Sequence, residues 1–202
     1  MLKELFKKAH QQTLKTMGGG VITAHTTLTA RKKVLNEEGQ RILDSGVCTL
    51  QDLAQTRPEL WDYTKEAHRF VRDKVVTDVF CEDIVDNLIA EVSTFGDYKY
   101  HHSGTGVGAE AAANTALGTP ELDARTVGTQ VEDSSKVYKS IATETFDGVA
   151  AITEHGLFNT AGAGGPPVVG GILMDRTLFA AINVVSGNQI EWTFTLALAS
   201  GG

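Results

Sequence analysis

Cysteine is scarce in this sequence. Only two are present, Cys48 and Cys81, far apart in the chain, with no CxxC pattern and no histidine at a metal-ligand spacing. Disulfide scaffolds and structural zinc sites depend on several cysteines at close, repeated spacings, and neither pattern is present. We expect two buried free thiols rather than a disulfide, because unpaired cysteines are among the most buried residue types.

Long apolar runs are also missing. No segment approaches the ~20 consecutive apolar residues of a membrane span. The N-terminus lacks the hydrophobic region of a signal peptide. We therefore expect a protein that is made in a cytosol and has no membrane anchor.

Sequence patterns of known catalytic chemistry are absent as well. The chain contains no GxSxG, no HExxH and no identifiable carboxylate dyad. Its acidic residues from Asp78 onward are scattered singly, as they are on a solvated surface. The expectation is a protein that is not an enzyme, with no catalytic residues, no cofactor and no metal.

Basic residues are too few, and too unevenly placed, for a nucleic-acid-binding C-terminal part. Residues 1–74 hold 13 Lys and Arg against 9 Asp and Glu, whereas residues 75–202 hold 5 against 16, which together give the net charge of −7. Nucleic-acid phosphates attract basic surfaces, so we expect no such binding by the C-terminal part. With 202 residues, of which 42% are hydrophobic, the chain suits one large domain or two small ones.

What is abundant is β signal, above all in the last third of the chain. Residues 172–184 and 189–198 are rich in β-branched and aromatic side chains and are separated by Ser186-Gly187-Asn188. That pattern predicts a hairpin, since Gly and Asn accept the positive φ of tight turns. In the second arm the even positions from Ile190 to Leu198, Trp192 included, are apolar, which predicts a strand with one face on a core.

Shorter extended segments occupy the chain from residue 98 onward. Residues 98–102 predict a strand that enters a glycine-rich loop. Residues 137–146 and 149–158 predict two strands around Asp147-Gly148, a strong hairpin turn. We therefore expect residues 96–202 to form an antiparallel β-sandwich that is jelly-roll-like.

The N-terminus carries a different pattern. Residues 1–16 predict a basic amphipathic helix whose lysines lie mostly away from its apolar side, and three glycines follow at 18–20. The apolar positions are Leu2, Leu5, Phe6, Ala9 and Leu14. We expect this helix to dock on its own domain or on a neighbouring subunit, with membrane or nucleic-acid contact as the alternatives.

The remainder of the front part mixes strand and helix signals. Residues 21–28 predict a short strand, and residues 34–43 fit either a strand or a helix. Thr49 followed by Asp52 resembles a capping box at the start of a helix. A second helical pattern spans residues 59–76 beyond Pro58, and residues 82–92 form the clearest helix. The expected fold class is therefore α+β, with a mainly helical part at 1–95 followed by the β-sandwich at 96–202.

The glycine-rich segment from Gly104 to Gly108 raises the question of a phosphate-binding loop. It lacks the Gly-Lys-Ser/Thr that places a lysine on phosphates, and no clear helix begins directly behind it. We interpret it as a structural glycine turn.

An acid/base or metal cluster could be imagined from His101, His102, Glu154 and His155. Adjacent residues of a strand point to opposite faces, so neither neighbouring pair can easily share a ligand. We interpret these side chains as satisfied polar groups at a strand edge or subunit contact.

Asp175-Arg176 is a charged pair inside an apolar strand pattern. Such a pair predicts an ion pair with a neighbouring strand, for instance with Glu154. We prefer this structural role to a substrate clamp.

Four pieces of the sequence occur together in an order that resembles a known group. They are residues 98–106 (YKYHHSGTG), 110–117 (EAAANTAL), 152–158 (ITEHGLF) and 172–179 (ILMDRTLF), ahead of the closing strand at 189–198. They resemble the GTG…AxxTAL loop, ITE-x-GLF strand and LLxRxxF strand of small virion structural proteins from tailed bacteriophages, a group of capsid decoration and head- or tail-associated β-sandwich proteins. The resemblance covers residues 98–199, and the first 95 residues resemble no group we can name.

The resemblance implies a non-enzymatic β-sandwich that works by binding other virion proteins. The first hypothesis is an oligomeric capsid decoration, or cement, protein that binds the major capsid protein and joins the virion in the host bacterial cytoplasm. The second is a neck or tail component such as a fibre or adaptor subunit. The third, from another class, is a host-glycan-binding or glycan-degrading module, for which Trp61 and the Tyr98/Tyr100 pair are the candidate aromatics.

Overall fold

The chain is mostly β. The computed structural model describes residues 22–70, 76–89 and 97–200, with 46% of the chain in strands and only three short helices among the described residues. The strands form two antiparallel sheets, one of them curved into a half-barrel. The expected α+β class with a mainly helical N-terminal part is therefore wrong.

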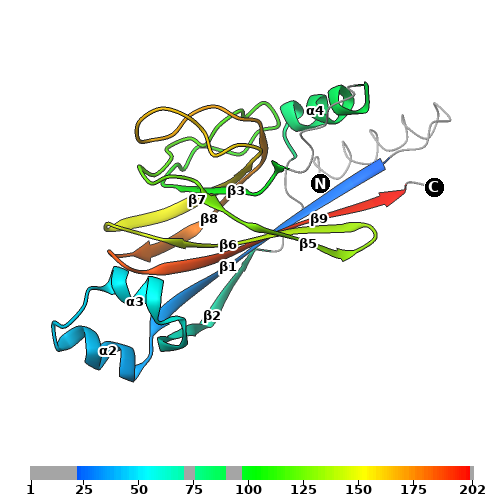
Figure 1. The fold of residues 1–202 in the computed structure, drawn as a ribbon. Helices are drawn as coiled ribbons and strands as arrows, with labels where there is room; N and C mark the ends of the chain where they lie inside the picture. Colours follow the sequence, from blue (N-terminus) through cyan, green and yellow to red (C-terminus); the bar gives the residue numbers. More distant parts are fainter. Residues whose placement is uncertain (1–21, 71–75, 90–96, 201–202) are drawn as a thin grey trace, which may run out of the picture.

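Each sheet combines strands that are distant in sequence (Figure 1). The five-stranded sheet has, in spatial order, β2 (Trp61–Phe70), β1 (Ile22–Leu35), β9 (Gln189–Ser200), β6 (Val137–Thr145) and β5 (Thr129–Ser134). The four-stranded sheet has β4 (Thr126–Val127), β3 (Tyr100–Gly104), β7 (Ala150–Phe158) and β8 (Leu173–Val184). Their facing sides share one hydrophobic cluster, in which Trp192 and Leu28 come from the first sheet and Ile152 from the second.

The long first strand, β1, overturns the helical expectation for the front of the chain. It pairs with β9 from Ile22–Ser200 to Lys33–Gln189, so one sheet is built from residues on both sides of position 95. Its other edge pairs with β2, in the segment where a second helix was expected. Helical spacing was a weak signal there, and pairing with the open edge of β1 prevailed over it, because sheet pairing depends on context more than on local preference.

The last strand, β9, has the predicted alternation over most of its length. Ile190, Trp192 and Phe194 are completely buried and Leu196 nearly so, which confirms the apolar face and the core position of Trp192. Leu198, at the end of the same row, is 45% exposed, so the prediction fails at that position.

Two predicted hairpins are connections between the sheets. β6 leads into β7 and β8 leads into β9, yet the members of each pair belong to different sheets. The two connections lie side by side, because the Phe146 amide donates to the Asn188 carbonyl at 2.9 Å and the Gly187 amide donates to the Phe146 carbonyl at 2.6 Å. Turn residues predicted the chain reversals correctly, but they carry no information on whether the flanking strands pair or face each other across a core.

Two short helices form a lobe between β1 and β2. The sequence pattern of residues 34–43 fitted either a strand or a helix. In the structure β1 ends at Leu35, and α2 (Glu37–Asp44) follows, capped by Asn36. The capping box predicted for α3 (Leu50–Thr56) is confirmed, since Thr49 and Asp52 exchange both hydrogen bonds. A short 3-10 helix, η1 (Pro58–Leu60), then leads into β2.

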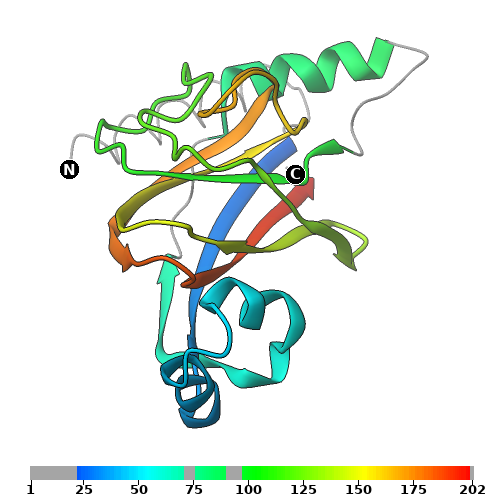
Figure 2. The same ribbon diagram turned by 60° about the vertical axis from the view of Figure 1, so that its left-hand side comes forward.

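The third helix, α4 (Asp78–Ile89), confirms the clearest helix expected from the sequence, although it begins four residues earlier than predicted. Figure 2 shows it at the opposite end of the molecule from the α2–α3 lobe. Phe80 anchors it in the core, where its ring meets that of Tyr98 at a centroid distance of 5.1 Å.

Three further expectations concern the cysteines, membrane spans and the N-terminal helix. Cys48 and Cys81 are free thiols as expected, but Cys81 is exposed and Cys48 half-buried rather than buried. In the described part of the chain, no helix has the length and apolar character needed to cross a bilayer. The amphipathic helix expected at residues 1–16 lies outside the described residues.

Candidate functional site

A buried ion pair with many partners lies on the face of the four-stranded sheet that points away from the core. Arg176 Nε of β8 donates to Glu154 Oε2 of β7 at 2.7 Å, and the two side chains are 5% and 0% exposed. This confirms the ion pair predicted for Asp175-Arg176. Asp175 points the other way, into the core, where Thr177 and Thr26 donate to its carboxylate at 2.7 and 3.2 Å.

Glu154 also binds the backbone of a long loop. Its carboxylate accepts hydrogen bonds from the amides of Gly106 at 3.0 Å, Gly118 at 3.0 Å and Thr119 at 2.7 Å. Burial by itself would raise the pKa of this carboxyl, but the amides of Thr119 and Gly118 and the charge of Arg176 together hold that pKa below its ordinary value. Glu154 is therefore an ionised carboxylate whose hydrogen-bonding capacity is taken up by the protein itself.

The glycine-rich segment lies directly against this carboxylate. A Cβ on Gly106 would lie 2.3 Å from Glu154 Oε1, and one on Gly104 would lie 2.5 Å from the carbonyl oxygen of Thr119. Only glycine allows the backbone to approach so closely. The Gly106 amide, which a phosphate would need, already donates to Glu154. The geometry supports a structural glycine turn.

Arg176 and Glu110 fix the middle of the same loop. Arg176 Nη1 donates to the carbonyl of Ala109 at 3.3 Å and to Asn114 Oδ1 at 3.2 Å. The Glu110 carboxylate accepts the amide of Leu178 in β8. The loop between β3 and β4 is thus held on the sheet by two strands.

A second polar group lies inside the core, between the sheets. His101 Nδ1 of β3 and His155 Nε2 of β7 are 3.1 Å apart, and His101 Nε2 is 2.8 Å from Ser140 Oγ of β6. The His155 ring packs on Trp192 at a centroid distance of 4.4 Å. Burial lowers the pKa of His101 to about 3 and lowers that of His155 well below its ordinary value, so both rings are neutral at pH 7.

The tautomers of the two rings follow from their partners. His155 Nδ1 is buried and has no hydrogen-bond partner in the structure. A buried N–H without an acceptor costs more than a buried lone pair without a donor. We therefore assign a proton to His155 Nε2, which donates to His101, and a proton to His101 Nε2, which donates to Ser140.

Glu144 of β6 extends this polar group. Its carboxylate is 1% exposed and accepts hydrogen bonds from Trp192 Nε1 at 2.8 Å and from the Ser103 hydroxyl. Burial outweighs these two bonds and raises the pKa of Glu144 to about 7. We refer to His101, Ser103, Ser140, Glu144 and His155 as the buried polar layer.

The cluster imagined from the sequence is divided between two faces of the sheet. His101 and His155 meet in the core, whereas Glu154 faces the loop and His102 Nε2 lies 3.1 Å from the Glu121 carbonyl. Adjacent residues do point apart, as predicted. All four side chains are buried, so their interpretation as groups at a strand edge or subunit contact is wrong for the described chain. No trio of His, Cys, Asp and Glu in that part of the chain could hold a metal.

Sequence reasoning missed the two members of the buried polar layer that lie on β6. Ser140 and Glu144 alternate with residues of the opposite face, and polar residues at such spacing ordinarily indicate a solvent-facing row. Ala142 lies between them in the same row, and its apolar side chain was the sequence signal that this row faces the core. In the structure Ala142 is buried.

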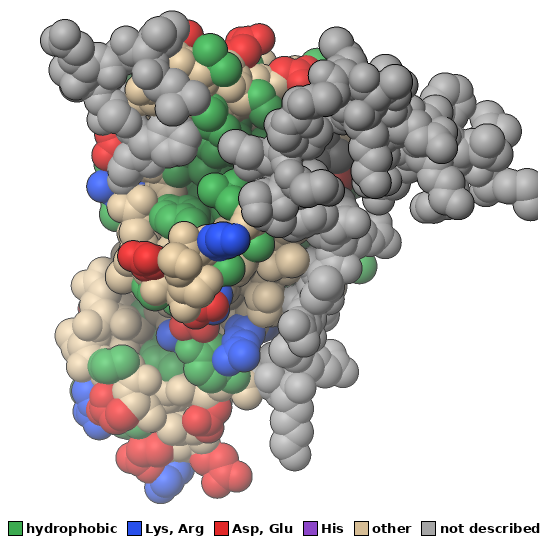
Figure 3. All heavy atoms as spheres, turned by 90° about the vertical axis from the view of Figure 1, so that its right-hand side faces the viewer, with side chains coloured by type: hydrophobic (Ala, Val, Ile, Leu, Met, Phe, Trp, Pro, Cys, Tyr) green, Lys and Arg blue, Asp and Glu red, His purple; other side chains and the backbone are tan. Residues whose placement is uncertain are grey.

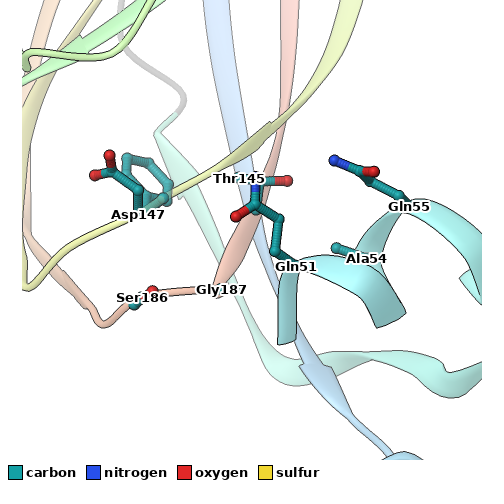
Figure 4. Close-up of a pocket in the computed structure, with 8 residues that line it drawn as sticks. Gln51, Ala54, Gln55, Thr145, Asp147, Ser186 and Gly187 are labelled. Atoms are coloured by element: carbon teal, nitrogen blue, oxygen red, sulfur yellow. The ribbon is translucent and has the colours of Figure 1, made fainter. Parts of the chain in front are cut away.

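Hollows in the described part of the surface include one near α3 and one along β5. One, of about 120 Å³, lies between α3 and the paired inter-sheet connections, where Figure 4 shows α3 with Gln51 beside Thr145. Amides and hydroxyls prevail in its lining, which includes Gln51, Gln55, Thr145, Asp147 and Ser186. The other, of about 290 Å³, lies along β5, β6 and the end of β9. Neither contains the pair of carboxylates that glycoside hydrolysis requires.

The candidate aromatics for glycan binding do not form an exposed platform. Tyr98 is buried and its hydroxyl donates to Asp83 Oδ2 at 2.7 Å. Trp61 is half-buried, with Nε1 3.5 Å from the Leu53 carbonyl, and Tyr100 packs against the cluster of Leu117, Phe158 and Leu173.

Comparisons with protein families, with characterised proteins and with solved structures found no match to this chain.

Proposed function

We propose that this chain is a non-enzymatic structural protein of a tailed-bacteriophage virion, and specifically a capsid decoration protein that binds the major capsid protein. The proposal rests on the resemblance of residues 98–199 to that group. It is supported by what the resembling residues do in the folded chain.

The observation that carries the proposal is the convergence of the four pieces on one point. Gly106 belongs to the first piece, Glu154 to the third and Arg176 to the fourth. The second, residues 110–117, supplies Glu110 and Asn114, which hold the loop on β8. These residues therefore build and fix a long surface loop and line no open cleft, which suits a protein whose function is to present a surface.

The charge distribution suits a component that is present in many copies. Residues 75–202 carry 16 acidic against 5 basic side chains, and like charge keeps exposed surfaces apart before assembly. The basic segment at residues 1–16 would complement an acidic patch on a shell protein.

The decisive test is the copy number of this chain relative to the major shell protein in purified particles. A ratio near one, or a simple fraction of one, is expected for a decoration protein. A ratio of a few per cent would overturn the capsid assignment in favour of a neck or tail component. Absence from particles would overturn the virion role itself.

A second test concerns the lysines of residues 1–16. Replacing Lys3, Lys7, Lys8 and Lys15 with Gln is expected to leave the sandwich folded and to weaken co-sedimentation with shells by at least about tenfold, since each exposed charge pair contributes up to about 1 kcal/mol. The matched control replaces the same lysines with Arg, which preserves the charge. Equal co-sedimentation of the Gln and Arg variants would contradict a docking role for this segment.

A further inference from the structure

The larger hollow is an apolar groove at one end of the five-stranded sheet. Val131 of β5, Val137 and Tyr138 of β6, and Leu196 and Leu198 of β9 supply its apolar lining. Leu198 is 45% exposed and Val131 37%. Figure 3 faces the end of the molecule where β1 begins and β9 ends, and hydrophobic side chains are visible there on the described surface.

The groove continues the core beyond the cover of the second sheet. Phe194, Leu196 and Leu198 lie in one row of β9, and their exposure rises from 0% to 7% to 45% toward the C-terminus. The alternation of the strand thus extends past the end of the packed interior. An apolar row of this kind is typical of a surface that another segment covers.

The chain that precedes the described residues starts at the rim of this groove. Ile22 pairs with Ser200 and Ala24 pairs with Leu198. From strand spacing and rise, Ile22 lies within about 10 Å of Leu198. Three glycines at 18–20 would let the preceding segment turn back over the sheet.

The chemistry of residues 1–16 matches the groove. Leu2, Leu5, Phe6 and Ala9 recur at helical spacing, and a helix of this length would extend about 24 Å. The groove is lined by one acidic and one basic residue, Glu132 and Lys136, and Asp133 beside it is paired with Lys139 at 2.7 Å, so the match lies in the apolar positions. The apolar positions of the segment are therefore complementary to the groove, and its lysines are not needed for that contact.

We propose that the groove formed by Val131, Tyr138, Leu196 and Leu198 is the docking site of this chain's own N-terminal segment, residues 1–16. A segment joined to the groove by five residues has an effective concentration in the millimolar range, which favours it over the same segment from a second copy. Its lysines would remain outward and available to an acidic partner. This inference does not depend on the virion role.

The test is hydrogen exchange of the full-length protein, followed by mass spectrometry of peptides from residues 1–16. The wild type is expected to protect these amides to the same degree at low and high protein concentration. Leu198→Asp is expected to speed their exchange about tenfold or more, because it places a charge in the groove. The matched control is Val149→Asp, at a side chain that is 84% exposed in the connection between β6 and β7, and it should change nothing.

A second variant separates docking from folding. Leu5→Asp changes the N-terminal segment and leaves the two sheets unaltered. It should speed the exchange of residues 1–16 as Leu198→Asp does, while peptides of β9 and β6 keep their protection. Unprotected amides in the wild type would overturn the proposal. So would protection that survives both variants, or protection that rises with protein concentration, which would indicate a second copy.

Discussion

At the scale of single residues, Glu154 ties several segments of the chain together. Three backbone amides and Arg176 converge on its carboxylate, so it joins β7, β8 and both ends of the loop between β3 and β4. Removing one partner of a buried ion pair leaves the other charge uncompensated in a medium of low polarity.

Glu154→Gln is therefore expected to lower the free energy of unfolding by about 3–5 kcal/mol, measured by denaturant titration. The matched control is Glu38→Gln, which breaks the exposed pair of Glu38 with Arg41 and should cost less than about 1 kcal/mol. Similar losses for the two variants would contradict the role assigned to Glu154.

The close approach of the glycine turn gives a second prediction at this scale. Gly106→Ala would place a methyl group 2.3 Å from Glu154 Oε1 and should lower the free energy of unfolding by about 1–3 kcal/mol. Gly108 is exposed and a Cβ there would meet nothing within 4 Å, so Gly108→Ala should stay within about 0.5 kcal/mol of the wild type. Thermal unfolding of the two variants, measured side by side, tests whether Gly106→Ala costs more stability than Gly108→Ala.

At the scale of elements, the inter-sheet connections determine the architecture. β6–β7 and β8–β9 each cross from one sheet to the other, and their paired turns meet the start of α3. A Cβ on Gly187 would lie 2.3 Å from Leu50 Cβ, and Gly187 has a φ of +81°. The α2–α3 lobe therefore packs against the inter-sheet turns, and Gly187, which has no Cβ, allows both the positive φ and this close contact.

The capping box of α3 provides the test at this scale. Thr49→Ala removes a hydroxyl that accepts the Asp52 amide at 3.1 Å, and it should lower the free energy of unfolding by about 1 kcal/mol. Thr49→Ser keeps an oxygen in that place and should retain most of the stability. An equal loss in both variants, measured by denaturant titration, would mean that the threonine methyl and not the cap is responsible.

At the scale of the whole molecule, the buried polar layer links the two sheets and makes their packing depend on pH. The unfolded chain binds protons at its histidines below about pH 6.5, whereas His101 and His155 stay neutral in the fold, so protonation favours unfolding as pH falls. Glu144 acts in the opposite direction between about pH 4.5 and 7, because the folded chain holds that proton and the unfolded chain does not.

Because the effect of two histidines exceeds that of one carboxyl, the free energy of unfolding decreases overall as pH falls. The free energy of unfolding should fall by at least about 1.4 kcal/mol per pH unit between pH 6 and 5. Glu144→Gln removes the opposing group and should steepen the slope between pH 6 and 5 to about 2.7 kcal/mol per unit. Denaturant titrations at each pH measure both slopes, and an unchanged slope in the variant would contradict the assignment.

Several features were determined by the sequence itself, because they depend on neighbours a few residues apart. The capping box of Thr49 and Asp52 is one, and the buried row from Ile190 to Leu196 in β9 is another. The ion pair of Arg176 with Glu154 was also predictable, since a charged residue inside an apolar strand needs an opposite charge within reach.

Only the tertiary structure decided which strands pair. Residues 61–70 became a strand because β1 offered an edge, and the turns at Asp147-Gly148 and Ser186-Gly187-Asn188 reverse the chain without specifying a sheet. The meeting of His101 with His155, and of both with Ser140, depends on the same choice. Local preferences act over a few residues. Pairing and burial instead depend on contacts between distant segments, such as Ile22 with Ser200, which are 178 residues apart, and those contacts determined the architecture.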